Sequence, residues 1–259
     1  MAAATAIFAG CKWLTWRRTP VPGAPWWKHI GYLLAWPGLD ARSFLSRGPL
    51  PAEELPRIPE WTSAILKMMA GVALFWGVAR LIPGERQMLY GWVGMIGLIL
   101  MLHFGAFHLL SCAWRSIGVD AKPLMRAPLK SVSVSEFWGR RWNTAFRDFT
   151  HRFFFRPLNS RLGLVWALVV GFVFSGIIHD LVISVPARGG YGWPTVYFST
   201  QAAAMLAERS GAGRMLGLGR SWRGRSFTML VLIVPAYGLF HPPFVMNVIV
   251  PFMQAVGAR

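Results

Sequence analysis

Long apolar segments alternate with shorter polar ones along this chain, and the long segments predict helices that cross a membrane. Four of them are long enough to span about 30 Å of hydrocarbon as single helices, and they cover residues 61–82, 88–110, 162–185 and 227–250. Three shorter segments are candidates for tilted, re-entrant or interfacial helices, and they cover residues 2–16, 26–39 and 193–207. The pattern predicts an all-α, polytopic integral membrane protein with about five to seven transmembrane helices.

Composition excludes an ordinary soluble domain. Apolar residues make up 54% of the chain and charged residues only 14%, whereas soluble domains carry about 25% charged residues. No internal repeat or low-complexity segment divides the sequence, so we expect one membrane domain over residues 1–259. The first 16 residues lack the basic start and cleavage site of a signal peptide, and we expect them to form a retained membrane helix. The lack of targeting signals favours a bacterial inner membrane.

The charge is strongly basic, with 27 Lys and Arg residues against 10 Asp and Glu residues and a net charge of +17. The basic residues gather in segments 17–60, 111–161 and 208–226, between the apolar ones. Loops rich in Lys and Arg stay on the cytoplasmic side of a membrane. We therefore expect these segments to be cytoplasmic, with an interfacial segment over about residues 111–160, and we expect no nucleic acid partner.

His179 is the most informative polar residue of the third long apolar segment. On a helix, Ser175, Gly176, His179 and Asp180 fall within one sector of about 140°, and bulky apolar side chains occupy the opposite side. An ionisable group inside a membrane helix faces the protein interior and often has a function. Imidazole suits general base catalysis near neutral pH. His179 is therefore a candidate base, the alternative being a histidine that packs between helices with one hydrogen bond.

Metal chemistry has no support in the spacing of the candidate ligands. The two cysteines, Cys11 and Cys112, form neither a disulfide framework nor a metal motif. His103 and His108 lie about 140° apart on a helix, so they are not expected to share a metal. We expect no metal site.

Residues 133–158 predict an amphipathic helix in the cytoplasmic interface. Ser133 and Glu136 have the spacing of a capping box, and Pro157 is expected to stop the helix. One face is aromatic, with Trp138, Trp142, Phe146, Phe149 and Phe153, and the other is basic, with Arg140, Arg141, Arg147, His151 and Arg152. Single-stranded nucleic acid also suits such a pattern, but adjacent membrane helices favour an anchor. Asn143 lies at the border of the two faces, where anchoring does not require an amide.

Two motifs give the chain a family resemblance. Phe137-Trp-Gly-Arg-Arg-Trp-Asn143, followed by Arg156-Pro157, and then Phe174-Ser-Gly-Ile-Ile-His179-Asp180-Leu181 resemble the wax synthase branch of the membrane-bound O-acyltransferases. Weaker similarities are the His103-Phe-Gly, Trp114-Arg115, Pro123-Leu-Met125 and Leu239-Phe-His-Pro-Pro-Phe244 segments. The chain departs from the family in having Asp180 where Glu is more common, and in being short.

The resemblance implies an acyl-CoA-dependent O-acyltransferase that esterifies a lipophilic hydroxyl acceptor, with a long-chain alcohol favoured. It assigns the catalytic base to His179 and the second polar catalytic residue to Asn143. The residues expected to bind substrate are Trp138, Arg140, Arg141, Trp142, Ser175 and Asp180. No cofactor is expected besides the co-substrate acyl-CoA, because its thioester is already activated.

Two other classes of function stay open. One is a transporter or channel in which His179, Asp180 and His108 form an ion path. Asp180 is the one acidic residue inside the four long apolar segments, and no inverted repeat is visible, which weighs against transport. The other is a non-catalytic membrane scaffold that keeps the interfacial helix.

Overall fold

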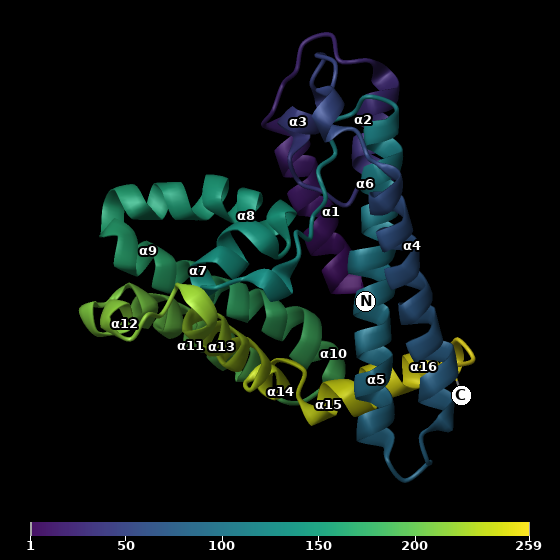
Figure 1. Cartoon of the computed structure of the whole chain (residues 1–259), viewed down its shortest axis with the longest axis vertical. Coiled ribbons are helices and arrows are strands. Elements are labelled where there is room, and N and C mark those ends of the chain that lie inside the picture. The colour runs from purple at the N-terminus through teal and green to yellow at the C-terminus, as the bar shows by residue number, and fades with distance from the viewer. Residues whose placement is uncertain (1, 259) are drawn as a thin grey trace. The chain divides into compact units, whose positions relative to one another are not determined.

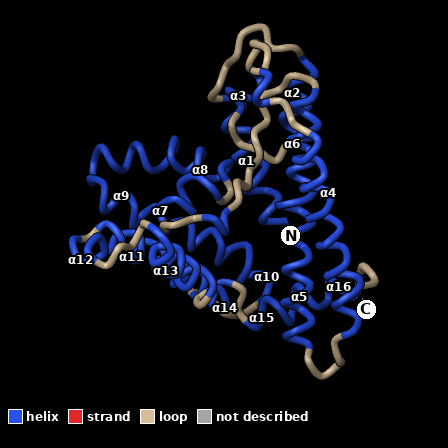
Figure 2. Tube along the Cα trace, in the orientation of Figure 1, coloured by secondary structure: helices blue, strands red, loops and turns tan. Residues whose placement is uncertain are grey.

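The computed structural model describes residues 2–258, and every regular element in this range is a helix (Figure 1 and Figure 2). The all-α prediction is thus confirmed. The described residues pack as two compact units. The N-terminal unit comprises Thr5–Met125 and residues 252–258, and the C-terminal unit comprises Arg126–Pro251 and residues 2–4. The expectation of a single membrane domain stays a prediction.

Two long helical rods dominate the N-terminal unit. Its elements are α1 (Ala2–Arg17) from residue 5 onward, α2 (Trp26–Ala35), α3 (Ala41–Leu45), η1 (Ala52–Glu54), α4 (Ile58–Val72), η2 (Ala73–Gly77), η3 (Val78–Leu81), α5 (Gln87–Ile99), η4 (Leu100–Ala106) and α6 (Phe107–Ser116). The first rod runs from η1 through α4 to η3, and the second runs from α5 to α6. The two rods pack so closely that a Cβ on Gly97 would lie 2.9 Å from the carbonyl oxygen of Gly71.

The C-terminal unit contains the two motif segments. Its elements are η5 (Pro128–Lys130), α7 (Val134–Glu136), η6 (Phe137–Arg141), α8 (Thr144–Thr150), η7 (His151–Phe155), α9 (Arg156–His179), η8 (Asp180–Ser184), α10 (Val185–Ala187), α11 (Trp193–Arg209), α12 (Gly211–Met215), α13 (Ser221–Ile233), α14 (Ala236–Leu239), α15 (Pro242–Phe244), η9 (Val245–Ile249) and the start of α16 (Val250–Ala255). η6 and η8 are π-helical, a geometry that is frequent at functional sites.

Three described helices are long and apolar enough to cross a membrane, namely Ala52–Leu81, Gln87–Ser116 and Thr144–Ala187. The pair Ser221–Leu239 and Pro242–Ala255, bent by 61° at the break between them, gives a fourth if it is one span. These four coincide with the four long apolar segments. The three shorter segments do not add spans by this measure, so the expected count of about five to seven is not confirmed.

The prediction of one continuous amphipathic helix over residues 133–158 is wrong. The helix ends at Arg141, Trp142 is extended, and Asn143 has a left-handed backbone with φ of 41°. Asn tolerates this conformation better than most residues. The chain is helical again from α8 onward, so Trp138 and Trp142 do not share a face with the three phenylalanines. An interfacial position for this segment is not confirmed.

Pro157 does not stop the helix as expected, because it lies in the first turn of α9. A proline has no N–H to donate, and the π-helical η7 directly before α9 accommodates that interruption of the hydrogen-bond ladder. The break falls instead at Gly163, whose φ of 76° and ψ of 170° are not helical. Glycine adopts this conformation at little cost. The apolar stretch predicted to begin at residue 162 therefore starts at a real kink.

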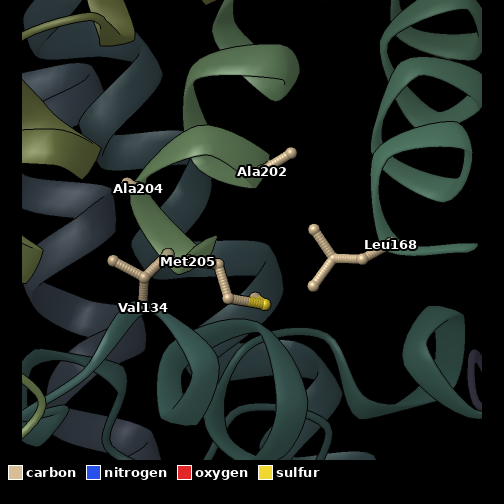
Figure 3. Close-up of a cluster of buried hydrophobic side chains, with 5 residues drawn as sticks. All are labelled: Val134, Leu168, Ala202, Ala204 and Met205. Atoms are coloured by element: carbon tan, nitrogen blue, oxygen red, sulfur yellow. The ribbon is translucent and has the colours of Figure 1, made fainter. Parts of the chain in front are cut away.

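α11 is the buried helix around which the C-terminal unit packs. Ala202, Ala204 and Met205 of α11 form a buried cluster with Val134 of α7 and Leu168 of α9. Figure 3 shows the Met205 side chain pointing toward Leu168. A second cluster contains Tyr197 and Phe198 of α11 with Ile183 and Leu239. The short apolar segment 193–207 therefore forms a core helix, which contacts both motif segments.

Candidate active site

The imidazole of His179 is held in one tautomer by its own helix. Its Nδ1 lies 2.7 Å from the carbonyl oxygen of Ser175, one turn earlier in α9. A carbonyl oxygen only accepts hydrogen bonds, so Nδ1 is the donor and carries the proton in the neutral ring. The lone pair is then on Nε2. Ser175 thus orients the ring through its backbone, while its hydroxyl donates to the carbonyl of Gly171 at 3.0 Å.

The small, polar sector of α9, which its residue pattern predicts to face the protein interior, meets α11 at Gly176. Gly176 is buried, and a Cβ there would lie 2.5 Å from the Cα atom of Thr195. On the opposite side, the exposed fractions of Ile177 and Leu181 are 49% and 44%. The prediction that His179 looks into the protein is confirmed, because its ring packs against Phe198 of α11.

An aromatic wall leads from the first motif to His179. The rings of His179 and Phe198 have centroids 4.3 Å apart, and those of Phe198 and Trp138 lie 5.5 Å apart. Phe172 of α9 contacts both Trp138, at 6.0 Å, and Phe198, at 6.4 Å. The structure therefore brings Trp138 and His179 to the same aromatic wall.

Asp180 ties the end of α9 to the start of α11. Its carboxylate accepts hydrogen bonds from the Thr195 hydroxyl at 2.5 Å, the Thr195 N–H at 3.2 Å and the Gly192 N–H at 2.8 Å. These amides lie at the N-terminus of α11, where a carboxylate is favourable. Asp180 thus fixes the helix that carries Phe198. Its expected role in binding substrate stays a prediction.

A buried histidine continues this network. The Ser184 hydroxyl lies 2.8 Å from the Asp180 carboxylate and 3.1 Å from Nε2 of His241, whose exposed fraction is 2%. Nδ1 of His241 accepts from the Phe244 N–H at 3.2 Å, so its proton is on Nε2 and faces Ser184. Ser184 in turn donates to the carboxylate. His241 therefore supports Asp180 rather than serving as a second base.

Two buried polar residues of α11 hold the first motif in place. Gln201 accepts from the indole N–H of Trp138 at 3.3 Å and donates to the carbonyl of Val231 at 2.9 Å. Glu208 accepts from the backbone N–H groups of Val134 and Ser135, at 2.7 and 3.0 Å. These are orphan donors at the start of α7, which a carboxylate satisfies. The first motif and His179 are therefore positioned by the same helix.

The capping box expected at Ser133 is present with a small change. The Ser133 hydroxyl accepts from the Glu136 N–H at 2.8 Å, and the Glu136 carboxylate accepts from the Val132 N–H, also at 2.8 Å. Burial raises the pKa of Glu136, but the Val132 N–H and the Arg141 guanidinium outweigh it and leave this pKa below its ordinary value. Arg141 lies 2.7 Å from the same carboxylate.

The two arginines expected to bind substrate differ in their surroundings. Arg141 bridges Glu136 and the carbonyls of Arg126 and Ala127, at 3.2 and 3.4 Å. Arg140 is exposed. Trp142 stacks on Phe137 with centroids 5.4 Å apart and an interplanar angle of 14°. Arg140 is therefore the better placed of the two arginines to meet a phosphate from solution.

Asn143 is the N-cap of α8. Its side-chain oxygen accepts from the Phe146 N–H at 3.3 Å, and its backbone carbonyl accepts from the Arg147 N–H at 3.1 Å. The side-chain oxygen of Asn143 is therefore committed to capping α8. The expectation that Asn143 acts with His179 stays a prediction.

Sequence reasoning missed Phe198, Gln201 and Glu208, which all lie on α11. An available signal was the polarity of Gln201 and Glu208 within a segment otherwise rich in apolar residues. A buried polar side chain must have a partner, and here each one has its partner in or beside the first motif.

The comparisons with known proteins point to one family. Residues 121–200 match the Membrane bound O-acyl transferase family, and this range contains both motifs. The chain is 29% identical over 143 residues to probable long-chain-alcohol O-fatty-acyltransferase 9 of Arabidopsis thaliana, covering 50% of this chain and 42% of the relative. It is 24% identical over 175 residues to the long-chain-alcohol O-fatty-acyltransferase of Simmondsia chinensis, covering 60% and 49%.

A further relative is acyl-CoA–sterol O-acyltransferase 1 of Arabidopsis thaliana, 29% identical over 87 residues, which cover 31% of this chain and 25% of the relative. The chain thus spans less than half the length of these relatives. All three are plant proteins, so the expected bacterial inner membrane has no support from them. The match at residues 121–200, together with the apolar helices, confirms the resemblance of this membrane protein to the membrane-bound O-acyltransferases of the wax synthase type.

Proposed function

We propose that this chain is an acyl-CoA-dependent O-acyltransferase that esterifies a long-chain alcohol, with His179 as the general base. The observation that carries the proposal is the hydrogen bond from Nδ1 of His179 to the Ser175 carbonyl, which leaves Nε2 as the basic atom. The similarity to long-chain-alcohol O-fatty-acyltransferases supports the substrate class.

The proposed reaction is a single acyl transfer. Nε2 of His179 takes the proton of the acceptor hydroxyl while that oxygen attacks the thioester carbonyl. The tetrahedral intermediate then expels the CoA sulfur, the C–S bond breaks, and the imidazolium returns its proton to the thiolate. An ester and free CoA leave. The thioester is already activated, so the proposed reaction needs no metal or redox cofactor.

The other expected site residues have distinct parts in this proposal. Asn143 would orient a substrate or stabilise the developing oxyanion. The exposed guanidinium of Arg140 would bind a phosphate of acyl-CoA. The wall formed by Trp138, Phe172 and Phe198 would hold an acyl or alkyl chain beside His179.

No contact among the described residues favours either a transporter or channel or a non-catalytic scaffold. An ion path needs Asp180 and His108 to exchange protons or ions. The Asp180 carboxylate instead accepts bonds from Thr195, Gly192 and Ser184, and His108 is bonded to Glu60 at 2.9 Å. A scaffold without turnover does not require the tautomer that Ser175 enforces on His179.

The test is an assay of the purified, full chain with labelled acyl-CoA and a panel of hydroxyl acceptors that includes long-chain alcohols, diacylglycerol and a sterol. We expect ester and free CoA thiol to form in equal amounts, and faster with the long-chain alcohols than with the others. Thiol release without ester would indicate hydrolysis, and no release with any acceptor would contradict the proposal.

A further inference from the structure

A cluster of three different metal-ligating side chains lies in the N-terminal unit, apart from the residues assigned to the reaction. Glu60 comes from the first turn of α4, and His108 and Cys112 come from α6. One ligand atom of each lies within 4.8 Å of the others. His108 and Cys112 are four residues apart, which places both side chains on the same face of the helix.

Contacts within the cluster hold these donors together. Nε2 of His108 lies 2.9 Å from Oε1 of Glu60. Arg115, one turn after Cys112, donates to the same carboxylate oxygen and lies 3.6 Å from the Cys112 sulfur. Arg115 is itself held by the Glu54 carbonyl at 2.9 Å and the Ser111 hydroxyl at 3.2 Å. The carboxylate is therefore oriented before any ion arrives.

Two of the three ligands in the cluster are partly exposed. The exposed fractions of the His108 and Glu60 side chains are 15% and 27%, whereas Cys112 is fully buried. Glu60 lies near the start of one long helical rod and Cys112 near the end of the other. An ion from the aqueous phase can therefore reach Glu60 and His108 first.

We propose that Glu60, His108 and Cys112 bind one Zn²⁺ ion. Imidazole nitrogen, thiolate sulfur and carboxylate oxygen are the three protein ligands of zinc, and a tetrahedral site with three of them leaves one position for water. The ion joins α4 to α6 with bonds that replace the hydrogen bond between His108 and Glu60. This site is independent of the proposed acyl transfer, since none of its ligands takes part in that reaction.

Zinc binding releases the proton of the Cys112 thiol. The Cys112 S–H bond breaks as the sulfur binds zinc, and its proton goes to solvent. The proton on Nε2 of His108 moves to Nδ1, so that the ring stays neutral and Nε2 can bind the ion. The Arg115 guanidinium remains near the new thiolate and favours it. Zinc, two anionic ligands and Arg115 then leave a net charge of +1, whereas an ion beside a protonated thiol would leave +2.

The test uses the full chain with Cys11→Ser, so that Cys112 is the remaining thiol. After chelator treatment, the protein is titrated with Co²⁺ as a spectroscopic probe and then with Zn²⁺. We expect thiolate-to-cobalt charge-transfer absorption that saturates at one ion per chain and is abolished by zinc.

Substitutions identify the ligands. His108→Asn should weaken zinc binding by more than about 100-fold, beyond the 10- to 100-fold effect of residues that only orient ligands. Cys112→Ser in the wild-type background should abolish the charge-transfer band. His103→Asn and Glu54→Gln are matched controls on the same rods and should leave binding unchanged.

Two results would overturn the proposal. One is the lack of thiolate-to-cobalt charge-transfer absorption in the Cys11→Ser protein, a measurement that needs no ligand substitution and so is free of folding effects. The other is metal binding that survives Cys112→Ser, which would assign the ion to another place in the chain.

Discussion

Replacing Gly176 by alanine tests whether the close approach of α9 and α11 positions His179. The new Cβ would lie 2.5 Å from the Cα atom of Thr195 and 3.2 Å from its Cβ, whereas carbon atoms in contact are about 3.5–4.0 Å apart. The helices must therefore separate by about 1 Å. Overpacking of this kind costs about 1–3 kcal/mol of stability, and a 1 Å misplacement in a catalytic site costs about 100-fold in rate.

Gly171→Ala is the matched control on the same helix, because a Cβ at this position meets no atom within 4 Å. Alanine there should stabilise the helix by up to about 1 kcal/mol. Thermal unfolding in detergent and kcat for ester formation are measured for both variants. We expect Gly176→Ala to unfold at lower temperature and to lose about 100-fold in kcat. Equal stability and equal kcat for the two variants would refute the role assigned to this contact.

Three further predictions concern the first motif. Gln201→Leu leaves the Trp138 indole N–H and the Val231 carbonyl without this partner and should lower the free energy of unfolding by about 1–3 kcal/mol. Adding Trp138→Phe should cause little further loss of stability, whereas fully additive losses would contradict the pairing of Gln201 with Trp138. Arg140→Gln should raise KM for acyl-CoA, and added salt should mimic the effect in the wild type. Arg141→Gln should mainly lower stability, because it removes the partner of Glu136. Equal changes in KM for the two variants would contradict the different roles given to the two arginines. Because the pKa of Glu136 is lowered in the folded state, its stabilising effect is present above its unfolded pKa and is lost as pH falls through the folded pKa. Glu136→Gln should therefore flatten the acid side of the unfolding profile, and an unchanged profile would contradict this assignment.

Periodicity was a reliable guide to the long helices and to the orientation of the second motif. The sector of Ser175, Gly176, His179 and Asp180 could be predicted because one helix fixes the directions of all four side chains. The four long apolar segments could be predicted because length and hydropathy are properties of the segment alone.

Other features depend on partners far away in the sequence. The break at Asn143 follows from a left-handed backbone residue that caps the next helix, and helical periodicity does not encode it. α11 is too short for a confident span, and its importance comes from Asp180, Trp138 and Val134, which it contacts. The cluster of Glu60, His108 and Cys112 could not be predicted from the spacing of candidate ligands, because Glu60 and His108 are 48 residues apart in the sequence.

General base catalysis by His179 is tested most directly by kcat of a His179→Ala variant, with protein level and acyl-CoA binding measured on the same sample. We expect kcat to fall by about 100-fold or more, the scale of general base catalysis, with acyl-CoA binding retained. His103→Ala is the control and should keep near wild-type turnover, since His103 lies outside both motifs. A folded His179→Ala protein that still makes ester at near the wild-type rate would show that His179 is not the general base.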